Sequence, residues 1–276
     1  MLRARLLTAS VLLVLLALLL FRAPASIWQG AVLVAGLVAS WEWAGLARFP
    51  GASRLFYVLL TGVLAGGLSW ATAQESVVWL KVLYALSTLF WILLVPLWLV
   101  RQWRVESPAM LALTGWVVIL PTGFALVSLR LAGPWTLLMF MAVVWLSDTA
   151  AYFAGRALGR RKLAPAISPG KTWEGVAGAV VAVLLYAVVL GQWAGRPEDS
   201  TAGHVIRALS SGWVPLLLLL TALGIEGDLF ESWIKRCAGV KDSGTLLPGH
   251  GGILDRIDAL TATLPLVALL LLLEQS

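Results

Sequence analysis

Nine stretches of mostly apolar residues dominate the sequence, and they constrain its fold more than any other feature. An α-helix rises about 1.5 Å per residue, so about 20 apolar residues cross the hydrocarbon core of a bilayer. The stretches approach or reach that length and cover residues 6–21, 27–47, 55–73, 77–100, 108–129, 134–155, 173–194, 209–225 and 253–273. No alternating apolar and polar pattern competes with them, which disfavours a β-barrel. We therefore predict an all-α polytopic membrane protein with about nine transmembrane helices.

The composition excludes other classes of protein. Of the 276 residues 60% are hydrophobic and 12% are charged, whereas an ordinary soluble domain has roughly 45–50% and 25%. The net charge of +6 is scattered between the apolar stretches, which argues against a nucleic-acid-binding protein. The single cysteine, Cys237, cannot form an intramolecular disulfide.

The distribution of lysine and arginine predicts the orientation. With a cytoplasmic N-terminus, 15 of the 20 Lys and Arg residues lie in inner segments and five in outer segments, as the positive-inside rule requires. The two most polar loops, 156–172 and 226–252, then lie together on the cytoplasmic side. We expect the active site at this cytoplasmic interface.

The first apolar stretch has a second interpretation. Arg3 and Arg5 precede it and Ala23-Pro24-Ala25 follows it, a pattern that is also typical of a signal peptide. We favour retention because the stretch slightly exceeds the usual apolar length of roughly 7–15 residues. Cleavage after Ala25 would leave the remaining orientation unchanged.

Acidic residues gather in the last polar loop and around it. Six of the 14 acids fall within 33 positions, interleaved with Lys235, Arg236, Lys241 and Arg256; they are Glu226, Asp228, Glu231, Asp242, Asp255 and Asp258. Asp228, Glu231, Ser232 and Lys235 follow helical spacing, so a cytoplasmic extension of the eighth helix would present them on one face. One alternative remains open: the charges pair with one another and only set the topology.

The ninth span places two of these acids at the membrane edge. Residues 260–273 are only 14 in number, so the helix must begin near Ile253 to cross. Asp255 and Asp258 then share one side of its first turns. Because a lipid-facing carboxylate costs about 2.5–3.5 kcal/mol at depth, both should face a polar cavity or a cation.

The glycine-rich segment 239–252 precedes this helix. Its amide groups, followed by a helix start, suit phosphate oxygens. Carboxylates suit Mg²⁺, which leaves coordination positions for substrate phosphates, and Lys or Arg can neutralise those phosphates. The combination indicates phosphoryl or nucleotidyl transfer.

A second polar group follows the sixth span. Asp148, Tyr152 and Arg156 are spaced to line one helical face, and an intramembrane acid usually faces a cavity, so we favour a substrate or metal role for Asp148. The cations of loop 156–172 fit either a topological role or phosphate binding equally well. In contrast, we expect Glu42, between two tryptophans, to pair with Arg48 or form a local hydrogen bond rather than act in catalysis.

Several segments together form a specific pattern of residues at fixed spacing. The longest runs from Ser232 through Lys235-Arg236, Lys241-Asp242 and Pro248-Gly-His250-Gly-Gly to Asp255-Arg256-Ile-Asp258, and residues 147–152, 168–175 and 227–232 extend it. This pattern resembles that of the phosphatidate cytidylyltransferases, also called CDP-diacylglycerol synthases. The resemblance implies a magnesium-dependent enzyme of phospholipid biosynthesis, in the bacterial inner membrane, that converts CTP and phosphatidate into CDP-diacylglycerol and pyrophosphate.

The resemblance also implies roles for individual residues. Mg²⁺ would bind Asp228, Asp255 and Asp258, which form the catalytic set with Lys235. The residues expected to contact substrates are Asp148, Ser168, Lys171, Arg236, Lys241, His250 and Arg256. Residues 1–130 would form a scaffold and residues 131–276 the catalytic region. The expected partners are CTP, phosphatidate and membrane lipids, and nucleic acid is not expected to bind. A homodimer is a further expectation. Two alternatives stay open: a CTP-using lipid kinase and an ion-coupled secondary transporter.

Overall fold

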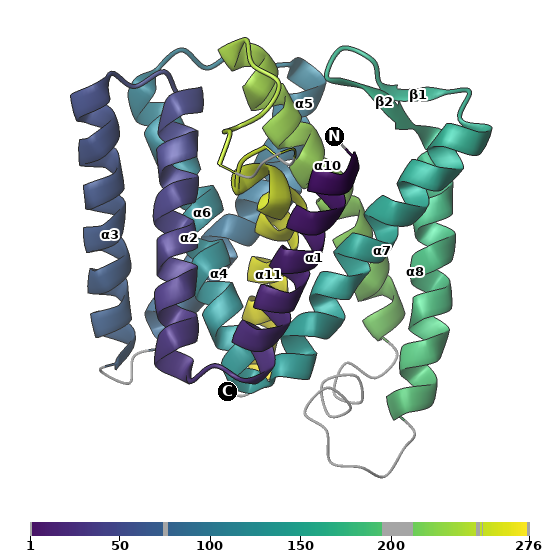
Figure 1. The fold of residues 1–276 in the computed structure, drawn as a ribbon, viewed down its shortest axis with the longest axis horizontal. Helices are drawn as coiled ribbons and strands as arrows, with labels where there is room; N and C mark the ends of the chain where they lie inside the picture. Colours follow the sequence, from purple (N-terminus) through teal and green to yellow (C-terminus); the bar gives the residue numbers. More distant parts are fainter. Residues whose placement is uncertain (1, 74–76, 195–211, 247–248, 250, 275–276) are drawn as a thin grey trace.

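The computed structural model describes residues 2–73, 77–194, 212–246, 249 and 251–274, which form a bundle of long helices (Figure 1). Seven helical segments are long and apolar enough to cross a membrane. They are α3 (Gly51–Ala73), the run Val78–Arg101, α6 (Pro108–Ala132), α7 (Pro134–Leu158), α8 (Trp173–Ala194), α10 (Trp213–Ala238) and α11 (Leu254–Glu274). The predicted class, an all-α polytopic membrane protein, is confirmed.

The first two helices are α1 (Leu2–Phe21) and α2 (Ala25–Leu46). The apolar part of α1, Thr8–Phe21, is shorter than a usual spanning helix, and α2 is not among the seven. All nine predicted stretches fall on helices, although residues 209–211 of the eighth lie outside the described part. The count of nine membrane spans stays a prediction.

A run of three helical segments supports the helix that carries most of the predicted site. α4 (Val78–Leu89), the π-helical turn η1 (Phe90–Leu94) and α5 (Val95–Arg101) are continuous. Phe90, Trp91 and Trp98 from this run pack edge-on against Phe230 of α10, with ring centroids 5.3–5.7 Å apart. Such aromatic pairs have a preferred geometry in addition to the apolar area that they bury. They therefore fix the part of α10 that carries its acidic residues.

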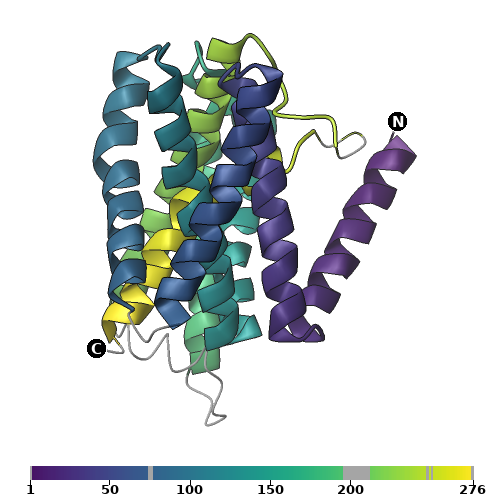
Figure 2. The same cartoon turned by 90° about the vertical axis from the view of Figure 1, so that its left-hand side faces the viewer.

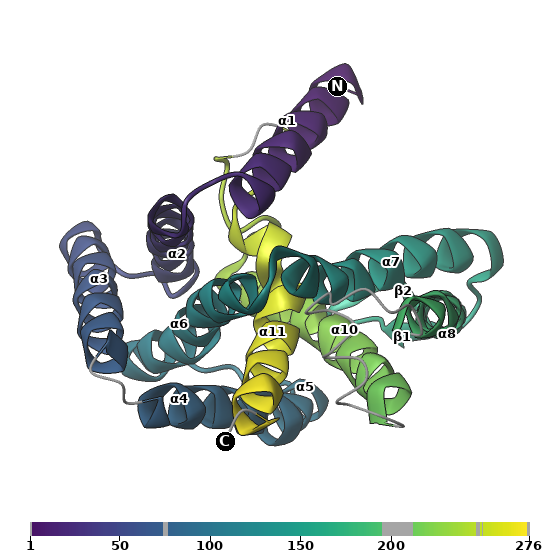
Figure 3. The same ribbon diagram turned by 90° about the horizontal axis from the view of Figure 1, so that it is seen from below.

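α11 lies at the centre of the bundle, with α4, α6, α7 and α10 around it (Figure 3). It is the most buried of the seven spanning segments. α1 leans away from the bundle (Figure 2). Its lower end is held by Arg130, which donates to the carbonyl oxygens of Leu20, at 3.2 Å, and Ala23.

The polar connections gather at one end of the bundle. α2, α5, α7 and α10 all end at the top of Figure 1, where the predicted inner segments follow them. Predicted loop 156–172 contains a short antiparallel hairpin of β1 (Lys162–Ala164) and β2 (Ser168–Thr172), with Lys162 opposite Thr172 and Ala164 opposite Ser168. The hairpin joins α7 to α8 and fixes the position of β2 beside α10.

Candidate active site

A cavity of about 820 Å³ lies at the polar end, between α7, β2, α8, α10 and α11. It brings together ten of the eleven predicted site residues: Asp148, Ser168, Lys171, Asp228, Lys235, Arg236, Lys241, Asp255, Arg256 and Asp258. The eleventh, His250, lies outside the described residues. Residues separated by more than 100 positions in the chain therefore line one space.

The second half of α10 forms one wall of the cavity. The helix continues beyond the predicted span to Ala238, so its polar residues share a face as their spacing predicts. Ser232 Oγ lies 3.2 Å from Asp228 Oδ1, and Lys235 Nζ lies 3.4 Å from Glu231 Oε2. The prediction that the helix extends beyond the eighth apolar span is confirmed.

α10 and α11 approach closely beside these acids. A Cβ atom at Gly227 would lie 2.6 Å from the carbonyl oxygen of Asp258, so only glycine permits this spacing. α11 begins at Leu254, one residue after the predicted start. The close packing brings Asp228 and Asp258 to the same cavity.

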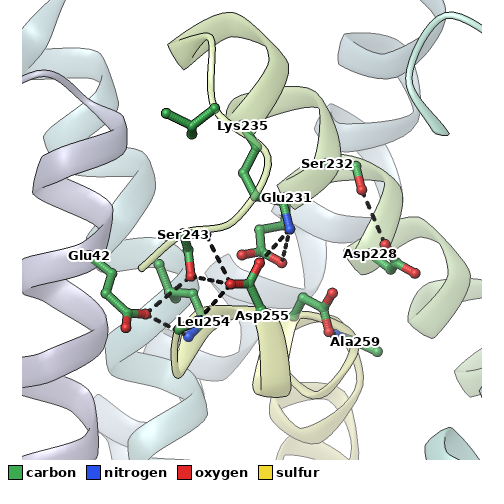
Figure 4. Close-up of polar contacts among 12 residues, drawn as sticks. Glu42, Asp228, Glu231, Ser232, Lys235, Ser243, Leu254, Asp255 and Ala259 are labelled. Atoms are coloured by element: carbon green, nitrogen blue, oxygen red, sulfur yellow. Dashed lines mark hydrogen bonds and ion pairs between the residues drawn. The ribbon is translucent and has the colours of Figure 1, made fainter. Parts of the chain in front are cut away.

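Lys235 and Asp255 form a buried ion pair across these two helices (Figure 4). Lys235 Nζ lies 2.6 Å from Asp255 Oδ1, and the two side chains are 11% and 6% exposed. Asp255 Oδ2 accepts hydrogen bonds from Ser243 N at 2.9 Å, Ser243 Oγ at 2.8 Å and Gly252 N at 2.8 Å. Both oxygens of this carboxylate thus already have donors.

A second ion pair connects the hairpin to α10. Lys171 Nζ on β2 lies 2.7 Å from Asp228 Oδ2 and 3.3 Å from the carbonyl oxygen of Ile225. On α7, Asp148, Tyr152 and Arg156 all line the cavity, as their spacing predicts. Arg156 donates to the Tyr152 hydroxyl at 3.0 Å.

The cavity lining contains six cationic side chains, Arg156, Lys171, Lys235, Arg236, Lys241 and Arg256, and five acids, Asp148, Asp228, Asp242, Asp255 and Asp258. Ion pairs within the set hold Lys171 and Lys235 in place. Lys241 and Arg256 have no ion-pair partner among the described residues. Such a lining can bind a ligand that carries several negative charges, because cations without an ion-pair partner remain beside the paired ones.

The acids of the cavity have the donor chemistry for a hard divalent cation. Among the described residues no group of three or more His, Cys, Asp or Glu is close enough to hold a metal. Mg²⁺ usually takes only one or two carboxylates and completes its shell with water and substrate phosphates. Asp228 and Asp258 line the cavity together and could supply such a pair. Both oxygens of Asp228 already have partners, Ser232 and Lys171, and so do both oxygens of Asp255, so each carboxylate would have to release a partner before it could bind a metal.

Sequence reasoning missed the role of Glu42. The prediction of a bond to Arg48 or to a nearby residue is wrong: Glu42 accepts from the amides of Ile253 at 3.0 Å and Leu254 at 2.9 Å. Arg48 instead donates to the carbonyl oxygen of Cys237 at the end of α10. The available signal was an acid inside an apolar span, which usually has a specific partner.

The expectation that the loop and the helix start offer their amides to phosphate is also wrong for four of them. The amides of Ser243 and Gly252 in the loop donate to Asp255, and those of Ile253 and Leu254 at the start of α11 donate to Glu42. These four amides are therefore not free to bind phosphate.

Fold and cavity together define a helical membrane protein with an ion-paired site for phosphate-bearing ligands. Comparison with known proteins makes the assignment specific. The sequence profile of the cytidylyltransferase family matches residues 3–273. The chain belongs to this family.

Three bacterial relatives are similar over nearly the whole chain, and each is named phosphatidate cytidylyltransferase. The Haemophilus influenzae protein is 34% identical, with 96% of both chains covered. The Pseudomonas aeruginosa protein is 37% identical, with 98% of this chain and 97% of the relative covered. The Brucella suis protein is 36% identical, with 88% and 85% covered.

Proposed function

We propose that this protein transfers the CMP moiety of CTP to phosphatidate and releases pyrophosphate, which yields CDP-diacylglycerol for phospholipid biosynthesis. Family membership and the names of three relatives support the reaction. The observation that carries the proposal is the cavity between apolar helices, because it brings cations and carboxylates from α7, β2, α10, α11 and the loop before α11 together where a lipid and a nucleotide can meet.

The reaction joins two polyanions. A phosphate oxygen of phosphatidate attacks the α-phosphorus of CTP; a new P–O bond forms, and the bond to the β-phosphate breaks as pyrophosphate leaves. Two unit charges about 4 Å apart repel by about 4 kcal/mol at an effective dielectric near 20. The nucleophile is already an anion, so the reaction depends on charge neutralisation and alignment rather than on a general base.

The cations of the cavity are suited to this task. We assign phosphate contacts to Lys241 and Arg256, which have no ion-pair partner among the residues described, and to Arg236, which lines the same cavity. Lys171 and Lys235 are held by Asp228 and Asp255, at 2.7 and 2.6 Å, and present fixed positive charge. Ser168 and Asp148 complete the substrate-binding wall, and His250 stays a predicted substrate contact.

We propose Asp228 and Asp258 as the residues that hold Mg²⁺. Bound there, the ion would neutralise developing charge on phosphate oxygens and orient them. The protein residues would keep their own tasks: Lys171 orients Asp228, and the close packing at Gly227 keeps Asp258 beside it.

The site is proposed to face the cytoplasm from a bacterial inner membrane, with nine spans. The positive-inside distribution supports this orientation, with 15 of 20 Lys and Arg residues in the proposed inner segments. Residues 131–276 supply the whole described cavity lining, which supports a catalytic region there and a scaffold in residues 1–130. Labelling of single cysteines with a membrane-impermeant maleimide tests the orientation, and light scattering of the purified protein tests the expected homodimer.

Purified protein in detergent, supplied with CTP, phosphatidate and Mg²⁺, tests the reaction. We expect CDP-diacylglycerol and pyrophosphate in equal amounts. Release of CDP with a phosphorylated lipid would instead indicate a lipid kinase. Ion uptake into vesicles without CTP and without a product lipid would indicate a transporter.

A further inference from the structure

Glu42 on α2 caps a helix at the far end of the sequence. The residue is only 4% exposed. Oε1 accepts the amide hydrogen of Ile253 at 3.0 Å, and Oε2 accepts that of Leu254 at 2.9 Å (Figure 4). The first amides of a helix have no partner within the helix and favour negative charge. Here the cap of α11 comes from another helix, 211 positions earlier.

Asp255 holds the same segment from the other side. Its Oδ2 accepts from the amides of Gly252 and Ser243. The amides of three consecutive residues, 252–254, therefore point at two buried carboxylates. The Ser243 hydroxyl lies between these carboxylates, 2.8 Å from Asp255 Oδ2 and 3.3 Å from Glu42 Oε2; its single hydrogen is donated to one of them at a time.

The loop closes tightly around the Glu42 carboxylate. A Cβ atom at Gly252 would lie 2.5 Å from each Glu42 oxygen, and one at Gly244 would lie 2.7 Å from Oε1. Real Cβ contacts are essentially never this short. Both positions therefore leave room for the carboxylate only because they are glycine.

The contacts connect Glu42 to the cavity without placing it there. Glu42 is not among the cavity-lining residues, whereas Lys241 and Asp242, directly before Ser243, are. Asp255 accepts from amides that neighbour those bound by Glu42, and its other oxygen lies 2.6 Å from Lys235 Nζ. A shift of the loop would therefore move Asp255 and Lys235 together.

We infer that Glu42 is a positioning residue of the transferase site: it fixes Ser243 and the start of α11 at residues 253–254, and thereby the orientation of Asp255 and Lys235. The inference rests on the proposed function. It assigns part of the site to the N-terminal half, none of whose described residues line the cavity.

The test compares Glu42→Gln with Glu106→Gln in the purified full-length enzyme. Glutamine keeps the size but places an NH₂ group opposite amide donors. We expect kcat to fall about 10–100-fold, with the KM values for CTP and phosphatidate changed less than kcat. Glu106 is exposed, so its variant should match the wild type.

A double variant separates positioning from a general loss of structure. If Glu42 acts through the loop, adding Ser243→Ala to Glu42→Gln should cost much less than the product of the two single effects. Independent, multiplicative effects would overturn the inference, as would a Glu42→Gln enzyme with kcat within twofold of the wild type.

Gly252→Ala covers the case in which Glu42→Gln does not accumulate in the membrane. The added methyl group meets the Ser243 hydroxyl and both Glu42 oxygens, so it disturbs the contacts between them and should lower kcat in the same way. Gly66→Ala is the matched control, because a Cβ there meets nothing within 4 Å. Wild-type kcat in Gly252→Ala would refute the inference, whereas a wild-type enzyme that forms no CDP-diacylglycerol would refute the proposed function instead.

Discussion

Replacement of Lys235 by methionine tests the buried ion pair in the cavity wall. The ammonium group lies 2.6 Å from Asp255 Oδ1 and 3.4 Å from Glu231 Oε2, and both acidic side chains are 6% exposed. Apart from this ion pair, neither oxygen of Glu231 accepts a hydrogen bond from another of the described residues. Methionine keeps the apolar length of the side chain but leaves both carboxylates without this cation. Because removal of one partner of a buried pair costs about 3–5 kcal/mol, we expect the free energy of unfolding to fall by that amount.

The assay is reversible unfolding of the purified protein by SDS in mixed micelles, followed by circular dichroism. A double variant with Asp255→Asn should lose less stability than the sum of the single variants, because it leaves fewer uncompensated charges. Lys162→Met is the matched control; this cation on β1 is exposed, and we expect a change within about 0.5 kcal/mol. A Lys235→Met protein as stable as the wild type, or strictly additive effects, would refute the reasoning.

Three further predictions concern the metal site, the loop and the first helix. Asp228→Asn should raise the Mg²⁺ concentration for half-maximal pyrophosphate release at least about tenfold; an unchanged requirement contradicts the proposed ligand. Asp255→Asn should remain folded and inserted in the membrane but lose activity by orders of magnitude in the CDP-diacylglycerol assay, because Asp255 holds both Lys235 and Ser243 of the loop. Near wild-type turnover of this variant would refute a role of Asp255 in the reaction. Arg130→Gln should lower the free energy of unfolding by about 1.5–3 kcal/mol, because Arg130 holds the end of α1, while activity per folded molecule stays unchanged; equal thermal stability would show that this anchor contributes little.

The helices were predictable from hydropathy because a bilayer requires long apolar segments with internally satisfied backbones. The start of α11 followed from the same requirement, since residues 260–273 were too few to cross, and the helix begins at Leu254. The β1–β2 hairpin was not predicted. It has only three and five residues, and so short a segment carries no clear alternating pattern.

The acids and cations of the cavity were predictable as a set, because charged residues are rare near a membrane and their helical spacing assigns them to common faces. Their pairing was not. Lys235 has Glu231 one turn earlier on its own helix, yet the shorter contact is with Asp255 on α11. Spacing reveals neighbours within one helix, whereas the packing of two helices decides which contacts form between them.

The carboxylates behind the loop are the reason that we assign phosphate binding to side chains of the cavity. A glycine-rich loop before a helix ordinarily presents amides to an anion, but Glu42 and Asp255 already take the amides of residues 243 and 252–254. Substrate phosphate would have to displace a buried carboxylate to reach them, and that carboxylate would then lack a partner. Ser243 and residues 252–254 are thus held by carboxylates before substrate binds, and the proposed substrate contacts are the paired lysines together with Lys241 and Arg256. A preformed wall of this kind aligns two anions without the entropic cost of ordering the loop during the reaction.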